Sequence, residues 1–221
     1  MNKTVVITGA NRGIGLALCQ AFVEKNYQVY ALCRQTSAQL TSLNVNVVEG
    51  VDLSTEQGFN VMAAALSDIN IDLLICNAGI LRDESLHALN VDTIRQQFEV
   101  NALAPLRVVE LLQNNLSSGS KVAMITSRMG SIADNGSGGR YGYRMSKAAL
   151  NAASMSLSKD LAPRNIAVGI YHPGYVQTDM VNHGGDISAN VAADRLVNLM
   201  ENLTMAETGV FKHSNGEVLP W

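Results

Sequence analysis

The chain has 221 residues, of which 47% are hydrophobic and 16% charged, enough for one α/β domain with a full core and too few for two ordinary domains. Its formal net charge of -3 argues against a nucleic-acid-binding surface, which is usually basic. No run approaches the ~18 consecutive apolar residues of a membrane helix, and the first residues lack the features of a secretion signal.

Strand-like and helix-like segments alternate along the first half of the chain. The β-branched run 4–8 predicts a strand, and Ile14, Leu18 and Phe22 then recur at the spacing of an amphipathic helix. Ser54-Thr55-Glu56-Gln57 has the form of a capping box and predicts the start of another helix. Further apolar runs predict strands at 27–33, 45–51 and 71–76.

The second half continues this alternation. Helices are expected over about 92–116, around Tyr143 and over 189–203, and strands at 121–126, 166–171 and 209–211. Such alternation indicates βαβ units, so we predict an α/β fold with a doubly wound parallel sheet of about seven strands and helices on both faces. This single Rossmann-type domain would span 1–221, with a cofactor half over roughly 1–120 and a catalytic and substrate half over 121–221.

The cysteines and histidines bear on metals and on the cellular compartment. Cys19, Cys33 and Cys76 are odd in number, far apart and embedded in apolar runs, and the four histidines are scattered. This arrangement predicts buried free thiols in a reducing compartment, with neither a disulfide framework nor the spacing of a metal site. We therefore expect a cytoplasmic protein that binds no metal.

The turn after the first predicted strand is rich in glycine, with the spacing Gly9-x-x-x-Gly13-x-Gly15. Glycines allow a tight turn and a close approach to a pyrophosphate, and the following helix offers N–H groups at its start. The spacing differs from the commoner G-x-G-x-x-G, and many strand-to-helix turns use glycine for structural reasons alone. Its place at the first strand–helix junction favours nucleotide binding by Gly9, Asn11, Arg12, Gly13, Ile14 and Gly15.

The end of the second predicted strand distinguishes between nicotinamide cofactors. An NAD site usually has an acidic residue there for the ribose 2′-hydroxyl, but no acid follows until Glu49. Arg34, together with Arg12, could instead clamp a 2′-phosphate, although Arg34 could equally be a solvated residue at a strand end. The missing acid favours NADP(H).

Two further stretches fit the path of a bound dinucleotide. Asp52, with Leu53 beside it, could accept a hydrogen bond from the adenine amino group or could simply neighbour a helix cap. Asn77-Ala78-Gly79 follows the fourth predicted strand, where small residues let the backbone pass close to a cofactor, although alone it is a turn signal.

Tyr143 and Lys147 lie one helical turn apart in a segment with few helix-breaking residues. A nearby ammonium favours the phenolate and lowers a tyrosine pKa from its usual ~10 toward the range of an acid/base catalyst. Such pairs also occur by chance on surface helices. Tyr141 is the local competitor of Tyr143, but its partner four residues on is the uncharged Met145.

In their order and spacing, these motifs resemble the short-chain dehydrogenase/reductase family over essentially the whole chain. The matching positions are the glycine turn, Asp52, Asn77-Ala78-Gly79, Asn101, Ser127, Tyr143, Lys147, Pro173, Gly174 and Thr178. The runs 127–132, 143–147 and 218–221 look most like sniffer-type carbonyl reductases and C-factor-like members. Two departures are Cys76, where the family usually has Asn, and a longer gap before Tyr143 through the glycine-rich stretch 136–139.

The resemblance implies a catalytic role for four residues. Tyr143 would donate a proton to a carbonyl oxygen that Ser127 also hydrogen-bonds, while NADPH delivers hydride. Lys147 would hold the nicotinamide ribose and lower the tyrosine pKa, and Asn101 would hold a water in a proton relay to Lys147. Pro105 supports the last role, because it lacks the N–H that would bond the Asn101 carbonyl, although it could merely bend the helix.

The stretch after the sixth predicted strand is where family members contact the nicotinamide, which implicates Pro173, Gly174, Val176 and Thr178. Only a short segment, 179–188, separates this stretch from the last predicted helix. We therefore expect an open and permissive substrate pocket, with Met129, Tyr175 and Met180 among its apolar residues.

The leading hypothesis is an NADPH-dependent carbonyl reductase acting on an aldehyde, ketone or quinone, or an enzyme for the reverse oxidation. The alternative is an NADP(H)-binding signalling or regulatory protein with little turnover, against which the complete catalytic set argues. An extended sugar-nucleotide epimerase is disfavoured, because 221 residues leave no room for a substrate domain. We expect a small-molecule partner, neither nucleic acid nor membrane, and a homodimer or homotetramer.

Overall fold

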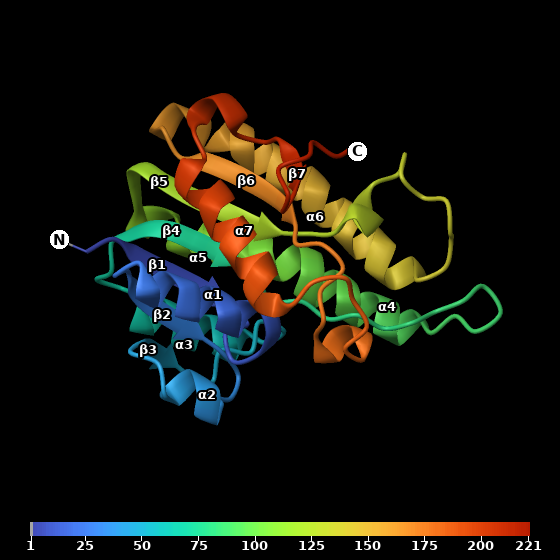
Figure 1. Cartoon of the computed structure of the whole chain (residues 1–221), viewed down its shortest axis with the longest axis horizontal. Helices are drawn as coiled ribbons and strands as arrows, with labels where there is room; N and C mark the ends of the chain where they lie inside the picture. Colours follow the sequence, from blue (N-terminus) through green and yellow to red (C-terminus); the bar gives the residue numbers. More distant parts are fainter. Residues whose placement is uncertain (1) are drawn as a thin grey trace.

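Seven strands form one sheet within residues 2–221, the part of the chain that the computed structural model describes. They are β1 (Thr4–Thr8), β2 (Gln28–Leu32), β3 (Asn46–Val48), β4 (Ile71–Cys76), β5 (Leu116–Ile125), β6 (Ala167–His172) and β7 (Phe211–His213). Their order is β3-β2-β1-β4-β5-β6-β7, and each neighbouring pair is parallel (Figure 1). The order reverses between β1 and β4, so the predicted doubly wound α/β fold is confirmed.

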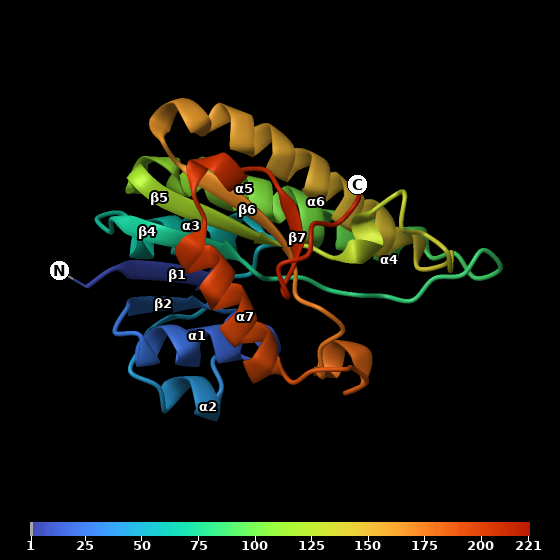
Figure 2. The same ribbon diagram turned by 45° about the horizontal axis from the view of Figure 1, so that its top comes forward.

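Helices cover both faces of the sheet (Figure 2). They are α1 (Gly13–Glu24), α2 (Ala38–Thr41), α3 (Glu56–Ala65), α4 (Val91–Phe98), α5 (Ala104–Leu112), α6 (Tyr141–Asp160) and α7 (Ala189–Asn202). Successive side chains of a strand point to opposite faces, so Val5 and Ile7 pack with α1 and α7, whereas Val6 packs with α3, α5 and α6. Burial on both faces explains why β1 and β6 are mostly apolar and buried along their whole length.

The helix expected over 92–116 is interrupted by a π-helical turn, Glu99–Leu103, which joins α4 to α5. At this turn the Ala104 N–H donates to the Glu99 carbonyl, five residues back instead of four. Pro105 explains the interruption, because its missing N–H removes one α-helical bond at this point. The prediction of one continuous helix was therefore wrong, and its last residue begins β5.

Two smaller predictions also needed correction. The capping box expected at 54–57 does not form, because Thr55 caps α3 and accepts from the Gly58 N–H at 3.1 Å. Glycine has no side chain with which to return that bond. The third strand is shorter than the predicted 45–51, and β7 begins at Phe211 instead of Gly209.

The buried free thiols predicted for Cys19, Cys33 and Cys76 are found. Burial raises the pKa of Cys19 and of Cys76 to about 12, so both are inert thiols. Over residues 2–221, no helix is both long and apolar enough to cross a membrane. In the same range no cluster of three or more His, Cys, Asp or Glu side chains could hold a metal ion.

Candidate active site

A cleft of about 930 Å³ opens at the carboxyl ends of β1 and β4, where the sheet order reverses. Its volume lies near the upper end of the range for small-molecule sites. The predicted residues that line it are Gly9, Asn11, Arg12, Gly13, Ile14, Gly15, Arg34, Asp52, Leu53, Asn77, Ala78, Gly79, Tyr143, Lys147, Pro173 and Thr178. The fold thus brings together most of the residues that the sequence singled out.

The glycine turn packs too closely for side chains at two positions. Gly9 has a φ of +66°, and a Cβ there would lie 2.8 Å from the Ala78 Cα. A Cβ on Gly15 would lie 2.1 Å from the Gly9 carbonyl oxygen. Only glycine fits both positions. The turn leads directly into α1, whose preceding residue Arg12 makes no side-chain cap, so backbone N–H groups remain to bind an anion.

Thr8 and Asn77 tie the glycine turn to the end of β4. The Asn77 side-chain nitrogen donates to the carbonyls of Thr8 and Gly9 at 3.0 and 3.1 Å. In return the Thr8 hydroxyl accepts from the N–H groups of Asn77 and Ala78 at 3.0 and 3.1 Å. The Asn77 side chain therefore holds the turn in shape. Thr8, which begins the matched glycine-turn motif, was not among the predicted site residues, although its place as the last strand residue before the glycines could have indicated it.

Charged side chains lie near the end of the second strand, where the sequence predicted a contact with a 2′-phosphate. Arg12 and Arg34 are exposed and line the cleft. Arg12 pairs with Asp179 at 3.3 Å, an exposed contact of the kind that contributes little, so a phosphate could replace it. Asp52 accepts from the N–H and hydroxyl of Ser54 at 3.0 and 2.7 Å. These bonds, with a smaller contribution from the charge of Arg34, lower the pKa of Asp52, which is thus both cap neighbour and cleft residue.

Lys147 lies buried at the base of the cleft, and its ammonium donates to the Ile125 carbonyl at 2.9 Å. Burial lowers the pKa of Lys147 from 10.5 to about 8. A Cβ on Gly79 would lie 3.2 Å from the Asn101 Oδ1 and 3.7 Å from the Lys147 Nζ. Asn101 and Lys147 therefore approach the same glycine from two different helices.

Tyr143 is buried at the edge of the cleft, and the Lys147 Nζ lies 5.9 Å from the centre of its ring. Burial raises the pKa of Tyr143, and the Ser127 hydroxyl and the Arg140 charge oppose this rise only in part. The prediction that Lys147 lowers this pKa is therefore wrong for the side chains of the protein alone. The ammonium is itself desolvated and bonds to a backbone carbonyl, while burial of the phenol outweighs the charges around it.

Asn101 lies fully buried in the π-helical turn, behind the residues that line the cleft. Its side chain accepts from the Ile80 N–H and donates to the Ile80 carbonyl, both at 2.8 Å. It also donates to the Ser146 hydroxyl at 3.0 Å and so joins the segment after β4 to α6. Its backbone carbonyl lacks the usual α-helical donor, because Pro105 stands four residues on.

Three more predicted residues lie outside the lining of the cleft. Ser127 is buried just beyond β5, where its hydroxyl accepts from the Met129 N–H at 3.1 Å. Gly174 turns the chain with a φ of +102°, and Val176 is buried and bridges to Ile187. The last two therefore shape the loop after β6, and Pro173 and Thr178 are the residues of that loop that line the cleft.

A second wall of the cleft was not foreseen from the sequence. It is built from the segment after β4, from α4 and its π-helical turn, and from the residues on either side of Thr178: Ile80, Arg82, Arg95, Gln96, Glu99, Val100, Gln177, Asp179 and His183. These residues carry no motif, and only the fold brings them to the site. Their charged side chains make this wall polar.

The expected apolar substrate residues are divided between two places. Met180 lines the cleft, whereas Met129 lines a separate cavity of about 590 Å³ between the segment 83–88 and the loop 137–140. Tyr175 is half-exposed, and its hydroxyl lies close against Gly184. The glycine-rich loop 137–140 is tied to α6, because Arg144 donates to Ser137 at 2.8 Å.

These residues fit a phosphorylated dinucleotide. The glycine turn leaves room for a pyrophosphate beside the start of α1, where side chains would collide with Ala78. Arg12 and Arg34 supply planar, permanently charged groups for a further phosphate. Tyr143 and Lys147 line the same cleft.

Comparison with known proteins agrees with this geometry. Residues 3–186 match the profile of the short chain dehydrogenase family. The 1-hydroxy-2-glutathionyl-2-methyl-3-butene dehydrogenase of Rhodococcus sp. (strain AD45) is 36% identical over 225 residues, covering 99% of this chain and 100% of that protein. The C-signal protein of Myxococcus xanthus is 39% identical over 154 residues, covering 68% of this chain and 93% of that protein.

Solved structures give the same result. The NADPH-bound carbonyl reductase from chicken fatty liver superposes with a TM-score of 0.89 at 27% identity, covering 100% of this chain and 99% of that one. The carbonyl reductase Sniffer of D. melanogaster has the same TM-score and identity and covers 100% of both chains. The predicted resemblance to sniffer-type reductases is confirmed, and the chain belongs to the short-chain dehydrogenase/reductase family of oxidoreductases.

Proposed function

We propose that the protein is an NADPH-dependent carbonyl reductase, which converts an aldehyde, ketone or quinone to an alcohol with Tyr143 as the acid. The observation that carries this proposal is the presence of Tyr143, Lys147 and the glycine turn in one cleft. The similarity to carbonyl reductases, one of them bound to NADPH, supports it.

NADPH, when bound, supplies the hydride. Tyr143, whose buried phenol is protonated at neutral pH, then donates its proton to the carbonyl oxygen. The Ser127 hydroxyl, which lies near Tyr143, can donate to the same substrate oxygen and so stabilise the negative charge that develops there.

Lys147 and Asn101 return the proton to Tyr143. Because the pKa of Lys147 is about 8, its ammonium can release a proton close to neutral pH, which an ordinary lysine does far less readily. The Asn101 carbonyl, which lacks an α-helical donor because of Pro105, is free to hold the water of a relay. Asn101 and Lys147 converge on Gly79, which supports such a path.

The proposal is tested with Tyr143→Phe and with Tyr141→Phe as its matched control. Protein and NADPH are mixed with a panel of aldehydes, ketones and quinones, and loss of NADPH absorbance is followed. Tyr143→Phe should lower turnover by about 10²- to 10⁴-fold, the usual contribution of a general acid, while NADPH binding by fluorescence titration is kept. Tyr141 is exposed, so its variant should stay active. Normal turnover in Tyr143→Phe would refute the mechanism.

A second candidate is an NADP(H)-binding signalling protein with little turnover, which the similarity to C-signal favours. Wild-type protein that binds NADPH tightly but oxidises it with no carbonyl compound would support this function. The presence of Asn101, Ser127, Tyr143 and Lys147 argues for turnover, because a sensor needs only the cofactor contacts.

The proposal includes a cytoplasmic location and self-association. The buried free thiols of Cys19, Cys33 and Cys76 support a reducing compartment. Exposed apolar side chains along α4, the π-helical turn and α5 support a homodimer or homotetramer: Phe98, Leu103, Leu106 and Leu111. Light scattering during gel filtration measures the assembly directly.

A further inference from the structure

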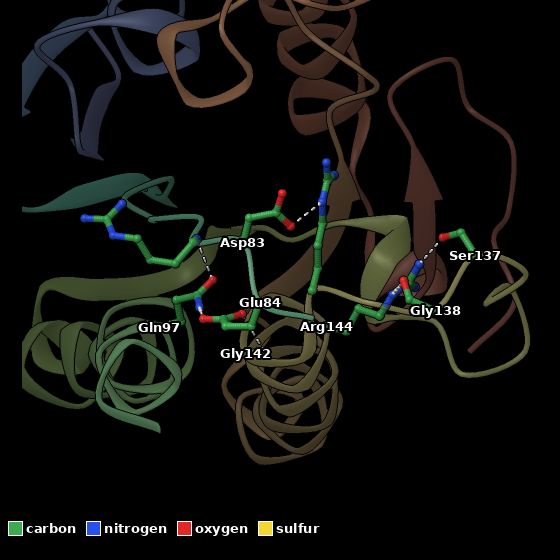
Figure 3. A network of polar contacts seen from close by, with 9 residues as sticks. Asp83, Glu84, Gln97, Ser137, Gly138, Gly142 and Arg144 are labelled. Atoms are coloured by element: carbon green, nitrogen blue, oxygen red, sulfur yellow. Dashed lines mark hydrogen bonds and ion pairs between the residues drawn. The ribbon is translucent and has the colours of Figure 1, made fainter. Parts of the chain in front are cut away.

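The segment after β4 carries a buried carboxylate, that of Glu84, which is only 3% exposed. Its oxygens accept from the Thr93 hydroxyl at 2.7 Å, from the Gln97 side chain at 2.6 Å and from the Gly142 N–H at 3.3 Å. Figure 3 shows Glu84 between Gln97 and Gly142. A buried carboxylate is costly unless its oxygens are hydrogen-bonded, so the position of each of these donors matters.

Glu84 supplies the cap that α6 lacks. The residue before this helix, Arg140, has a left-handed backbone with a φ of 50° and makes no side-chain cap. The Glu84 carboxylate accepts from Gly142 in the first turn, and the Glu84 carbonyl accepts from the Arg140 N–H at 2.9 Å. A negative charge at the N-terminal end of α6 is also stabilised by the helix dipole. The start of α6 is therefore fixed by a residue far away in the sequence.

The same segment also forms one wall of the cleft that would hold the cofactor, here called the cofactor wall. It begins with Asn77–Gly79, which line the cleft, and continues to Ile80, whose N–H and carbonyl both bond to the Asn101 side chain. The Arg82 N–H donates to the Gln97 side chain at 2.9 Å. With Glu84, every second residue from 80 to 84 is thus bonded to a neighbouring helix.

Tyr143 directly follows Gly142, so a displacement of the first turn of α6 would also displace the Tyr143 phenol. There is little room to accommodate one, because a Cβ on Gly142 would lie 2.5 Å from the Gln97 Nε2 and 3.0 Å from the Ile94 Cα. We propose that Glu84 is a positioning residue of the reaction, which fixes the start of α6, and with it Tyr143, relative to the cofactor wall. This inference rests on the proposed carbonyl reduction.

Glu84→Gln is the principal test. It keeps the shape of the side chain but replaces one acceptor oxygen by an NH₂ group, so the variant loses acceptor capacity among the three donors. A displaced Tyr143 should lower kcat by about 10- to 100-fold, because small errors in geometry are costly in catalysis. The solvent isotope effect on kcat should rise as proton donation becomes limiting, whereas the Kd for NADPH should stay unchanged.

Asp83→Asn is the matched control, because Asp83 is the exposed neighbour of Glu84 and pairs with Arg140 on the surface. Its kcat and NADPH affinity should equal those of the wild type. A normal kcat in Glu84→Gln would overturn the proposal, and so would a parallel loss of kcat and NADPH affinity, which indicates general damage. If Glu84→Gln does not fold, Thr93→Val removes one of the three bonds and should lower kcat alone, by a smaller factor.

Hydrogen exchange over residues 141–147 separates this inference from the proposed function. Glu84→Gln should speed exchange at the start of α6 and Asp83→Asn should not, even if the wild-type protein reduces no carbonyl compound. Unchanged exchange in Glu84→Gln would show that Glu84 does not fix the helix. Faster exchange combined with an inactive wild type would instead count only against carbonyl reduction.

Discussion

Gly9→Ala tests how tightly the glycine turn packs against the segment after β4. Gly9 has a φ of +66°, where an L-residue costs about 1–2 kcal/mol. The new Cβ would also meet the Ala78 Cα at 2.8 Å and the Ala78 Cβ at 3.2 Å. Overpacking of this kind typically costs about 1–3 kcal/mol, so the free energy of unfolding should fall by about 2–5 kcal/mol in total.

Gly138→Ala separates these two contributions. Gly138 has a similar φ of +62°, but a Cβ there would meet nothing within 4 Å. This variant therefore carries the backbone cost alone. Urea unfolding of both variants should show Gly9→Ala to be less stable than Gly138→Ala by about 1–3 kcal/mol, at equal dependence on urea.

The two variants should also differ in cofactor binding. The clash at Gly9 pushes the turn away from Ala78 and so disturbs the surface on which the pyrophosphate would lie. Fluorescence titration should show weaker NADPH binding for Gly9→Ala and unchanged binding for Gly138→Ala. Equal stability of the two variants, or wild-type NADPH affinity in Gly9→Ala, would refute the reasoning from close packing.

Two further predictions concern a buried charge and the choice of cofactor. The pKa of Lys147 is about 8 in the folded protein and 10.5 for the free side chain. Between these pH values the unfolded chain binds one more proton than the folded protein, so the free energy of unfolding should rise with pH, by about 3 kcal/mol in all. Urea unfolding at a series of pH values should show that Lys147→Met loses this rise, and an equal rise in the variant would disprove its origin. Arg34→Ala should weaken NADPH binding by about 10- to 100-fold and leave NADH binding unchanged, because one charge-assisted contact to the 2′-phosphate is lost. Parallel titrations with both cofactors measure this, and equal losses would exclude a 2′-phosphate contact for Arg34.

The parts of the fold that depend on local pattern were predictable. Residues such as Val5, Val6 and Ile7 form a continuous apolar strand because both faces of the sheet are covered, and this pattern is visible in the sequence. The glycine turn was predictable for the same reason, since tight turns need particular residues at fixed positions. Tyr143 and Lys147 were found because one helical turn separates them.

Contacts between distant segments were not predictable. Neither the bonds between Thr8 and Asn77 nor those of Glu84 leave a sequence pattern, because each depends on which strands and helices become neighbours. The predicted lowering of the Tyr143 pKa was wrong for a related reason. Spacing indicates a charge nearby, but only the folded structure shows how deeply the phenol is buried.

The alternating bonds of the segment after β4 have a consequence for changes in chain length. Because Ile80, Arg82 and Glu84 each bond to fixed groups on the neighbouring helical segments, deleting one residue among them would shift every later group out of reach. The exposed turn from Ser85 to Ala88 has no such bonds to α4 or α6 and closes on itself through a single bridge. Natural insertions and engineered tags in this region should therefore be tolerated after Ser85 and not before it.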